Sequence, residues 1–123
     1  MPRFGQHIRR QREALRRTDP AYSVRQLARR IGVEPSYLSK VERQLEAPPS
    51  EEKIRALARE LGEDPDALLA MAGKVATDLQ TTIRKRPILF SKLIRELKNR
   101  PDATVLRVIQ NLPEAKNRRR TRD

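Results

Sequence analysis

Two short apolar stripes separated by a single glycine constrain the fold of this 123-residue chain more than any other feature. Ser23 can cap a helix whose apolar residues recur at spacings of three and four, namely Val24, Leu27, Ala28 and Ile31. Gly32 follows, and glycine ends a helix readily because it adopts a positive φ with little strain. Pro35 suits the first position of a second helix, in which Leu38, Val41 and Leu45 are expected to turn inward. The pattern predicts two helices joined by a tight turn.

The opposite face of this second helix is short and polar. It carries Ser36, Lys40 and Arg43, and its only carboxylates, Glu34 and Glu42, stand at its two ends. A helix with such a face can approach a polyanion and still touch base edges in the major groove. The segment therefore predicts a helix-turn-helix that binds double-stranded DNA.

Residues 4–73 resemble the Cro and cI repressor-like helix-turn-helix family, also called the XRE family. Ser-Tyr-Leu-Ser-Lys-Val-Glu-Arg, at residues 36–43, is a familiar recognition-helix pattern of that family, and the Leu-Ala pair at residues 27–28 and the turn glycine lie in the same register. Two positions depart from it. Val24 stands where many members carry a glutamine that grips a phosphate, and Gln44 stands where many carry glycine. The second departure predicts a different exit into the loop that contains Pro48 and Pro49. The resemblance implies an all-α, five-helix DNA-binding domain.

The resemblance and the helix positions together assign candidate site residues. The predicted base-reading residues are Ser36, Tyr37 and Lys40, and the predicted phosphate contacts are Ser23, Arg25 and Arg43. A lysine at position 40 can reach guanine acceptors, whereas residues at a helix N-terminus or just beyond the recognition helix usually fix register on the backbone. The structural alternatives are that Ser36 only caps its helix, Tyr37 packs beside Val41 and Lys40 is an ordinary solvated residue.

Three further helices are expected around this motif. A scaffold helix over residues 4–17 places Phe4, Ile8 and Leu15 on one face and spreads Arg9, Arg10, Arg12 and Arg16 over the rest. Pro20 breaks it. Ser50 caps a fourth helix that buries Ile54, Leu57, Ala58 and Leu61 and closes at Gly62, and Asp64-Pro65 opens a fifth that ends at Gly73. These helices complete a predicted DNA-binding domain over residues 1–73.

Charge is distributed unevenly along the chain. The formal net charge of +12 divides into +7 for residues 1–43, −4 for residues 44–73 and +9 for residues 74–123. Such polarity favours a protein that turns one surface toward phosphate. The alternative, that arginine-rich helices only keep a small domain soluble, does not predict the change of sign at residue 44.

A helical C-terminal segment over residues 74–112 is expected to mediate dimerisation. Asp78 is predicted to cap a helix through Arg86, Pro87 to start another and Asp102 to open a last one. Isolated helices of this length are marginal in water, so their apolar faces need a partner surface. A homodimer would place two recognition helices roughly 34 Å apart on DNA. The alternative is a cap folded back on the chain's own core.

Residues 113–123 form a basic segment that is expected to be disordered without a ligand. Such a segment either sweeps along phosphates as a basic arm or simply keeps the terminus solvated.

Composition argues against several other classes. There is no cysteine, so disulfides, thiolate metal sites and cysteine nucleophiles are excluded. No apolar run has membrane-spanning length and no signal-peptide core begins the chain, so we expect a cytoplasmic, prokaryotic protein with no membrane association. The single histidine, His7, has no second ligand type beside it, so we expect no metal, no cofactor and no enzymatic activity.

Three functional hypotheses follow. The first is a dimeric transcriptional regulator, a repressor that binds a palindromic operator. The second is the antitoxin or immunity-type subunit of a two-protein module, in which the C-terminal helices hold a protein partner while the motif autoregulates the operon. The third is a sequence-blind nucleic-acid-coating or RNA-binding protein, against which the aromatic content of 3% argues because single strands are usually held by stacking.

Overall fold

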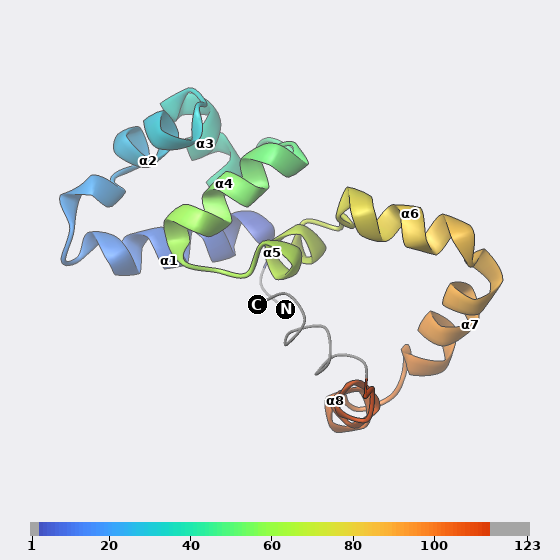
Figure 1. Ribbon diagram of the computed structural model, residues 1–123. Helices are drawn as coiled ribbons and strands as arrows, with labels where there is room; N and C mark the ends of the chain where they lie inside the picture. The colour runs from blue at the N-terminus through green and yellow to red at the C-terminus, as the bar shows by residue number, and fades with distance from the viewer. Residues whose placement is uncertain (1–2, 114–123) are drawn as a thin grey trace. The chain divides into compact units, whose positions relative to one another are not determined.

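The computed structural model describes residues 3–113, and over this range the regular structure is entirely helical (Figure 1). The elements in order are α1 (Phe4–Arg16), the 3-10 helix η1 (Pro20–Tyr22), α2 (Val24–Ile31), α3 (Pro35–Glu42), α4 (Glu51–Leu61), α5 (Pro65–Met71), α6 (Thr77–Lys85), α7 (Pro87–Leu97) and α8 (Asp102–Gln110). The chain divides into two compact units, Met1–Gln80 and Thr81–Asp123. The all-α prediction is confirmed.

Capping side chains set the starts of the helices in the first unit. The Ser23 hydroxyl accepts a hydrogen bond from the Gln26 N–H at 3.1 Å, and the Ser50 hydroxyl accepts one from the Lys53 N–H at 3.4 Å. Gly32 ends α2 with φ +80°, in the left-handed region that other residues adopt only with strain. The predicted starts and the predicted turn are therefore confirmed.

One hydrophobic core holds the first unit together. Helix α1 packs against α3, α2 packs against α3 and α4, and α4 packs against α5. The buried apolar residues are Phe4, Ile8, Leu27, Ala28, Ile31, Leu38, Val41, Ile54, Leu57, Ala58, Leu61, Leu68, Leu69 and Ala76. Because Leu38 and Val41 belong to this core, α3 is fixed along one side and solvated along the other.

The second unit is built differently. Within residues 81–113 no side chain is buried, and most of the large hydrophobic residues are exposed: Ile88, Leu89, Leu93, Ile94, Leu106, Val108, Ile109 and Leu112. Helices α7 and α8 thus have apolar faces that are solvated in the single chain. Helices of nine to eleven residues gain most of their stability from packing, and in the single chain these apolar faces lack it.

The predicted bounds of α6 are wrong at both ends, by two residues at the start and by one at the end. The helix begins at Thr77, which places Asp78 in the first turn and not at the cap, and it ends at Lys85. The Thr77 hydroxyl donates a hydrogen bond to Glu51 Oε1 at 2.8 Å, so the start of the helix is fixed against α4. The predicted basic segment lies outside the described residues, apart from Pro113.

None of the helices within residues 3–113 combines the length and the apolar character that crossing a membrane would require.

Candidate nucleic-acid interface

The outward face of α3 is open to solvent. Ser36 and Lys40 are exposed, while Leu38 and Val41 on the other side are 1% and 2% exposed. Pro35 starts the helix, so Ser36 lies in its first turn and Lys40 in its last. The two side chains with the predicted base-reading role are therefore available to a ligand, on a helix that the core holds in place.

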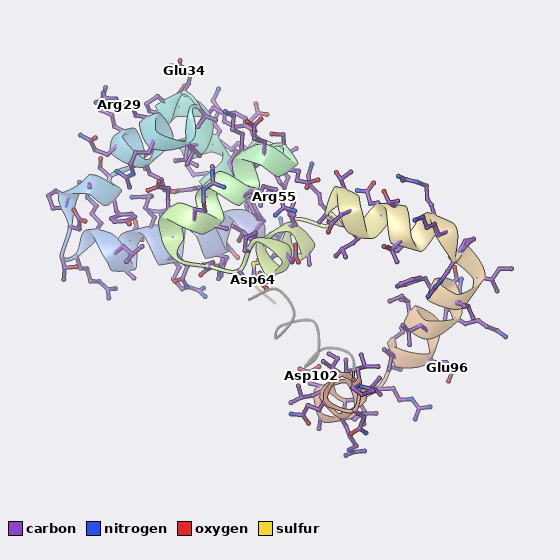
Figure 2. All side chains as sticks on the ribbon, in the orientation of Figure 1. Arg29, Glu34, Arg55, Asp64, Glu96 and Asp102 are labelled. Atoms are coloured by element: carbon purple, nitrogen blue, oxygen red, sulfur yellow. The ribbon has the colours of Figure 1, made fainter. Side chains whose placement is uncertain are left out.

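Basic side chains surround this face. Arg25 on α2 and Arg43 just after α3 are exposed, and Arg43 Nε donates to the Ser39 carbonyl at 3.4 Å. Arg29, one turn beyond Arg25 on α2, is also exposed and was missed as a candidate, although its four-residue spacing from Arg25 was the available signal. Figure 2 shows Arg29 and Glu34 projecting outward beside the turn between α2 and α3. Among the described residues, no hydrogen bond or ion pair engages the side chains of Arg25, Arg29 or Lys40.

Arg30, by contrast, makes its side-chain contacts within the fold. Its Nε donates to Glu60 Oε1 at 2.7 Å, and its guanidinium lies 4.9 Å from the centroid of the Tyr22 ring. The adjacent arginines on α2 thus have different surroundings. Arg29 faces solvent, whereas Arg30 connects α2 to α4 and η1.

Ser23 and Tyr37 are both half-buried. Ser23 caps α2 by accepting a hydrogen bond from the Gln26 N–H. The other N–H groups of the first turn have no carbonyl partner within the helix, as at any helix N-terminus. The Tyr37 ring packs against the core. Burial raises the pKa of the Tyr37 phenol, and the charge of Glu46 raises it further, so the hydroxyl stays protonated at neutral pH. The ring thus packs against the core that includes Val41, and both the specific contact with Val41 and the contact with DNA stay predictions.

A buried ion pair joins α3 to the scaffold helix. Arg12 Nε donates to Glu42 Oε2 at 2.7 Å and Arg12 Nη2 donates to Glu42 Oε1 at 2.9 Å, with both side chains 4% exposed. Arg12 Nη1 also donates to the Tyr22 carbonyl at 3.1 Å. The prediction that Arg12 lies on the surface of its helix and Glu42 on the outward face of α3 is wrong, because each satisfies the other's charge in the interior. This pairing also removes one carboxylate from the outward face.

Gly5 allows α1 to approach the end of α3 closely. A Cβ at position 5 would overlap the Val41 carbonyl oxygen and would lie 3.0 Å from the Glu42 carbonyl oxygen. Because both atoms belong to the backbone, they cannot move aside as a flexible side chain would. The orientation of α3 thus depends on a missing side chain in α1.

The exit from α3 is an ordinary left-handed closure made by a residue other than glycine. Gln44 has φ +66°, its N–H bonds the Val41 carbonyl at 3.0 Å and the Leu45 N–H bonds the Lys40 carbonyl at 2.8 Å. These bonds form a Schellman motif. The inward position predicted for Leu45 is wrong, because this residue is 64% exposed where the chain reverses at Gln44. That the exit differs from the one in other family members stays a prediction.

His7 is half-buried and bonds Glu63. Its Nε2 lies 2.6 Å from Glu63 Oε1, which joins α1 to the segment between α4 and α5. Within the part of the chain that the structure describes, no group of three or more His, Cys, Asp or Glu residues could hold a metal ion.

Comparison with known proteins agrees with this geometry. The family model described as Helix-turn-helix matches residues 8–68, from Ile8 in α1 to Leu68 in α5. No curated protein and no solved structure matches the chain. The matched range contains the capped helix α2, the turn at Gly32, the outward face of α3 and most of the core that supports them. The chain therefore belongs to the Cro/cI-type, or XRE, family of helix-turn-helix DNA-binding transcription regulators.

Proposed function

We propose that this regulator recognises a specific double-stranded DNA sequence through α3 and represses transcription as a homodimer on a palindromic operator. The observation that carries the proposal is the exposure of Ser36 and Lys40 on a helix whose opposite side is buried. Reading base edges requires side chains that are free to reach the groove from a backbone that does not move.

Each side chain has a role in this proposal. Lys40 donates to guanine O6 and N7, a contact that discriminates between bases by about 1–3 kcal/mol. Ser36 meets a base edge near the start of the helix, and Tyr37 presents its protonated hydroxyl beside it. Ser23, Arg25 and Arg43 hold the sugar-phosphate backbone on both sides and set the register of α3. Arg29 joins this set because it is exposed on the same helix as Arg25.

The exposed apolar faces of α7 and α8 support dimerisation. A monomer reads one half-site, whereas a two-fold dimer presents two α3 helices about one turn of DNA apart, roughly 34 Å. A dimer of this kind that covers a promoter would exclude polymerase, and this is the basis for assigning repression.

The same apolar faces favour a second candidate function. A different protein could occupy them, as in the antitoxin or immunity-type subunit of a two-protein module. A gene for a toxin or a metallopeptidase beside this gene would favour that function, and a protein that dimerises in isolation would favour the first.

Selection of bound duplexes from a random pool at physiological salt tests the proposal. We expect an inverted repeat whose half-site centres lie about 10 base pairs apart or at a multiple of that spacing. Competition with random duplex should leave the selected complex largely intact. A pool that returns no consensus, or a complex that random duplex removes as readily as the selected sequence does, would contradict sequence-specific regulation and favour sequence-blind binding.

A further inference from the structure

A hollow of about 520 Å³ opens in the second unit, and none of its lining residues is among those assigned to DNA. Its lining comes from one residue of α6, from four residues of α7 and from the residue that follows α7: Ile83, Phe90, Ser91, Ile94, Arg95 and Lys98. Sites for small ligands are typically of about 300–1,000 Å³ and are mostly apolar with a few convergent polar groups. The hollow has this size and this composition.

The lining is divided chemically. Ile83, Phe90 and Ile94 supply apolar and aromatic surface, whereas Arg95 in the last turn of α7 and Lys98 just after the helix supply two positive charges. Among the described residues, no hydrogen bond or ion pair engages the side chain of Arg95 or that of Lys98. A nearby arginine differs, because Arg100 Nη2 lies 3.8 Å from Glu96 Oε1. The hollow thus combines an apolar surface with two cationic groups whose charges are not neutralised.

The charge of the surrounding segment indicates the sign of the ligand. Residues 81–113 contain eight basic residues and two acidic ones, Glu96 and Asp102, both labelled in Figure 2. Neither acidic residue lines the hollow. A second copy of the chain placed symmetrically on this hollow would bring its own Arg95 and Lys98 against the first pair. Charge complementarity therefore favours an anion over self-contact.

The hollow leaves other apolar residues of α7 available for dimerisation. Leu89 and Leu93 are 64% and 45% exposed and do not line it. An occupied hollow and a dimer contact can thus coexist on the same helix.

We propose that the hollow is an effector site for a small amphipathic anion, an organic carboxylate with an unbranched apolar tail. The tail lies against Ile83, Phe90 and Ile94, and the carboxylate accepts hydrogen bonds from the Arg95 guanidinium and the Lys98 ammonium. Such a ligand contacts α6 and α7 together, so it links two helices that have no buried residues of their own. This inference goes beyond the proposed recognition of DNA and does not rest on it.

Calorimetric titration of the full-length protein with decanoate, below its micelle concentration, tests the proposal. We expect one decanoate per chain. Decyltrimethylammonium, which has a tail longer by one methylene and the opposite charge, should bind more weakly by about tenfold or more. Arg95→Glu should weaken decanoate binding by about tenfold. Lys92→Glu makes the same change of charge on the same helix outside the lining, and it should leave the affinity nearly unchanged.

A second variant tests the apolar surface. Phe90→Ala removes an aromatic ring while favouring the helix, since alanine has the higher helix propensity. Circular dichroism should show the helix content retained while decanoate affinity falls. The proposal would be overturned if decanoate did not bind, or if it bound no better than decyltrimethylammonium. It would also be overturned if Arg95→Glu and Lys92→Glu had equal effects, or if Phe90→Ala left the affinity unchanged.

Discussion

At the scale of single residues, the geometry of α3 depends on side chains that do not belong to its outward face. Arg12 and Glu42 form a two-point ion pair in the interior, and Gly5 lets the α1 backbone lie against the last carbonyls of α3. A buried charge without its partner is strongly destabilising, whereas an apolar pair of similar size is often tolerated. The pair therefore fixes α3 to α1 and makes each of its two residues depend on the other.

Removing one member of this pair should cost far more stability than removing both. We expect Arg12→Met to lower the free energy of unfolding by about 3–5 kcal/mol, and the double variant Arg12→Met with Glu42→Leu to be clearly more stable than the single one. Arg9→Met is the control, because the exposed pair Arg9–Glu13 should contribute less than about 1 kcal/mol. Denaturant unfolding followed by circular dichroism measures all three. A double variant no more stable than Arg12→Met would contradict this role of the pair.

Glycine at position 44 should relieve the backbone strain that Gln44 carries. Its φ of +66° costs a residue with a Cβ about 1 kcal/mol, and its side chain also accepts a hydrogen bond from Arg3 Nη1 at 3.0 Å. Gln44→Ala loses that exposed bond but keeps the strain, whereas Gln44→Gly loses both. We expect Gln44→Gly to exceed Gln44→Ala in stability by about 1 kcal/mol in thermal unfolding. Equal stability of the two variants would show that the closure is not strained.

The contact between Glu51 and Thr77 should make the stability of the fold vary with pH in the acidic range. The Thr77 hydroxyl lowers the pKa of Glu51 below its usual value, and the Thr77 N–H and Arg55 lower it further, against the opposing effect of burial. Since the folded-state pKa is the lower one, the stability that these bonds supply is present above the unfolded-state pKa and is lost as pH falls through the folded-state pKa. Thr77→Val should raise the pKa of Glu51 in an NMR titration, whereas Thr18→Val should not. An unchanged Glu51 titration in Thr77→Val would exclude this cause.

The sequence predicted the role of a residue well only where the contact that fixes this role lies within a few residues along the chain. Ser23, Gly32 and Ser50 act within four residues of their own positions, and each was predictable. Arg12 and Glu42 are 30 residues apart, so helical periodicity assigned both to the surface. Leu45 continued the apolar spacing of α3, but the reversal at Gln44 turned it into solvent.

At the scale of elements, the first unit and the second unit follow different rules. Helices α1 to α5 were predictable because each combines an end signal with an apolar stripe that the core covers. The start of α6 was not, because the hydrogen bonds from Thr77 to Glu51 on α4 form across 26 residues. Helices α7 and α8 match their predicted starts at Pro87 and Asp102, yet their apolar faces remain uncovered.

Those uncovered faces lead to a prediction about assembly. Ile109 is 54% exposed on α8, and the adjacent Gln110 lies on the polar side of the same helix. If α8 contributes to a dimer, Ile109→Glu should shift the protein toward monomer in sedimentation velocity, because a buried carboxylate at the contact is costly. Gln110→Glu introduces the same carboxylate one residue along and should leave the dimer intact. Equal sedimentation of the two variants would argue against this face as the contact.

At the scale of the whole molecule, the sequence places positive charge where the proposal needs it. Residues 1–43, which supply α1 to α3, have a net charge of +7, whereas residues 44–73, which supply α4 and α5, have a net charge of −4. This polarity favours approach to a polyanion by the side that carries α3. The positions of the base-reading atoms on a duplex were not predictable from the sequence, since shape and water contribute to the choice of sequence.

In the proposed function α3 reads bases while the surrounding arginines hold phosphates, and the Lys40→Ala variant separates these two roles. Binding should be measured on the selected duplex, on its single-base variants and on random duplex, with Arg25→Ala and the exposed α4 variant Arg59→Ala as comparisons. We expect Lys40→Ala to lose about 1–3 kcal/mol of binding free energy on the selected duplex and to relax the base preference at one position per half-site. Arg25→Ala should weaken all duplexes alike and reduce the salt slope by about 0.9, and Arg59→Ala should change little. If Lys40→Ala weakens selected and random duplexes equally and keeps every base preference, α3 does not read the sequence through Lys40 and the account is wrong.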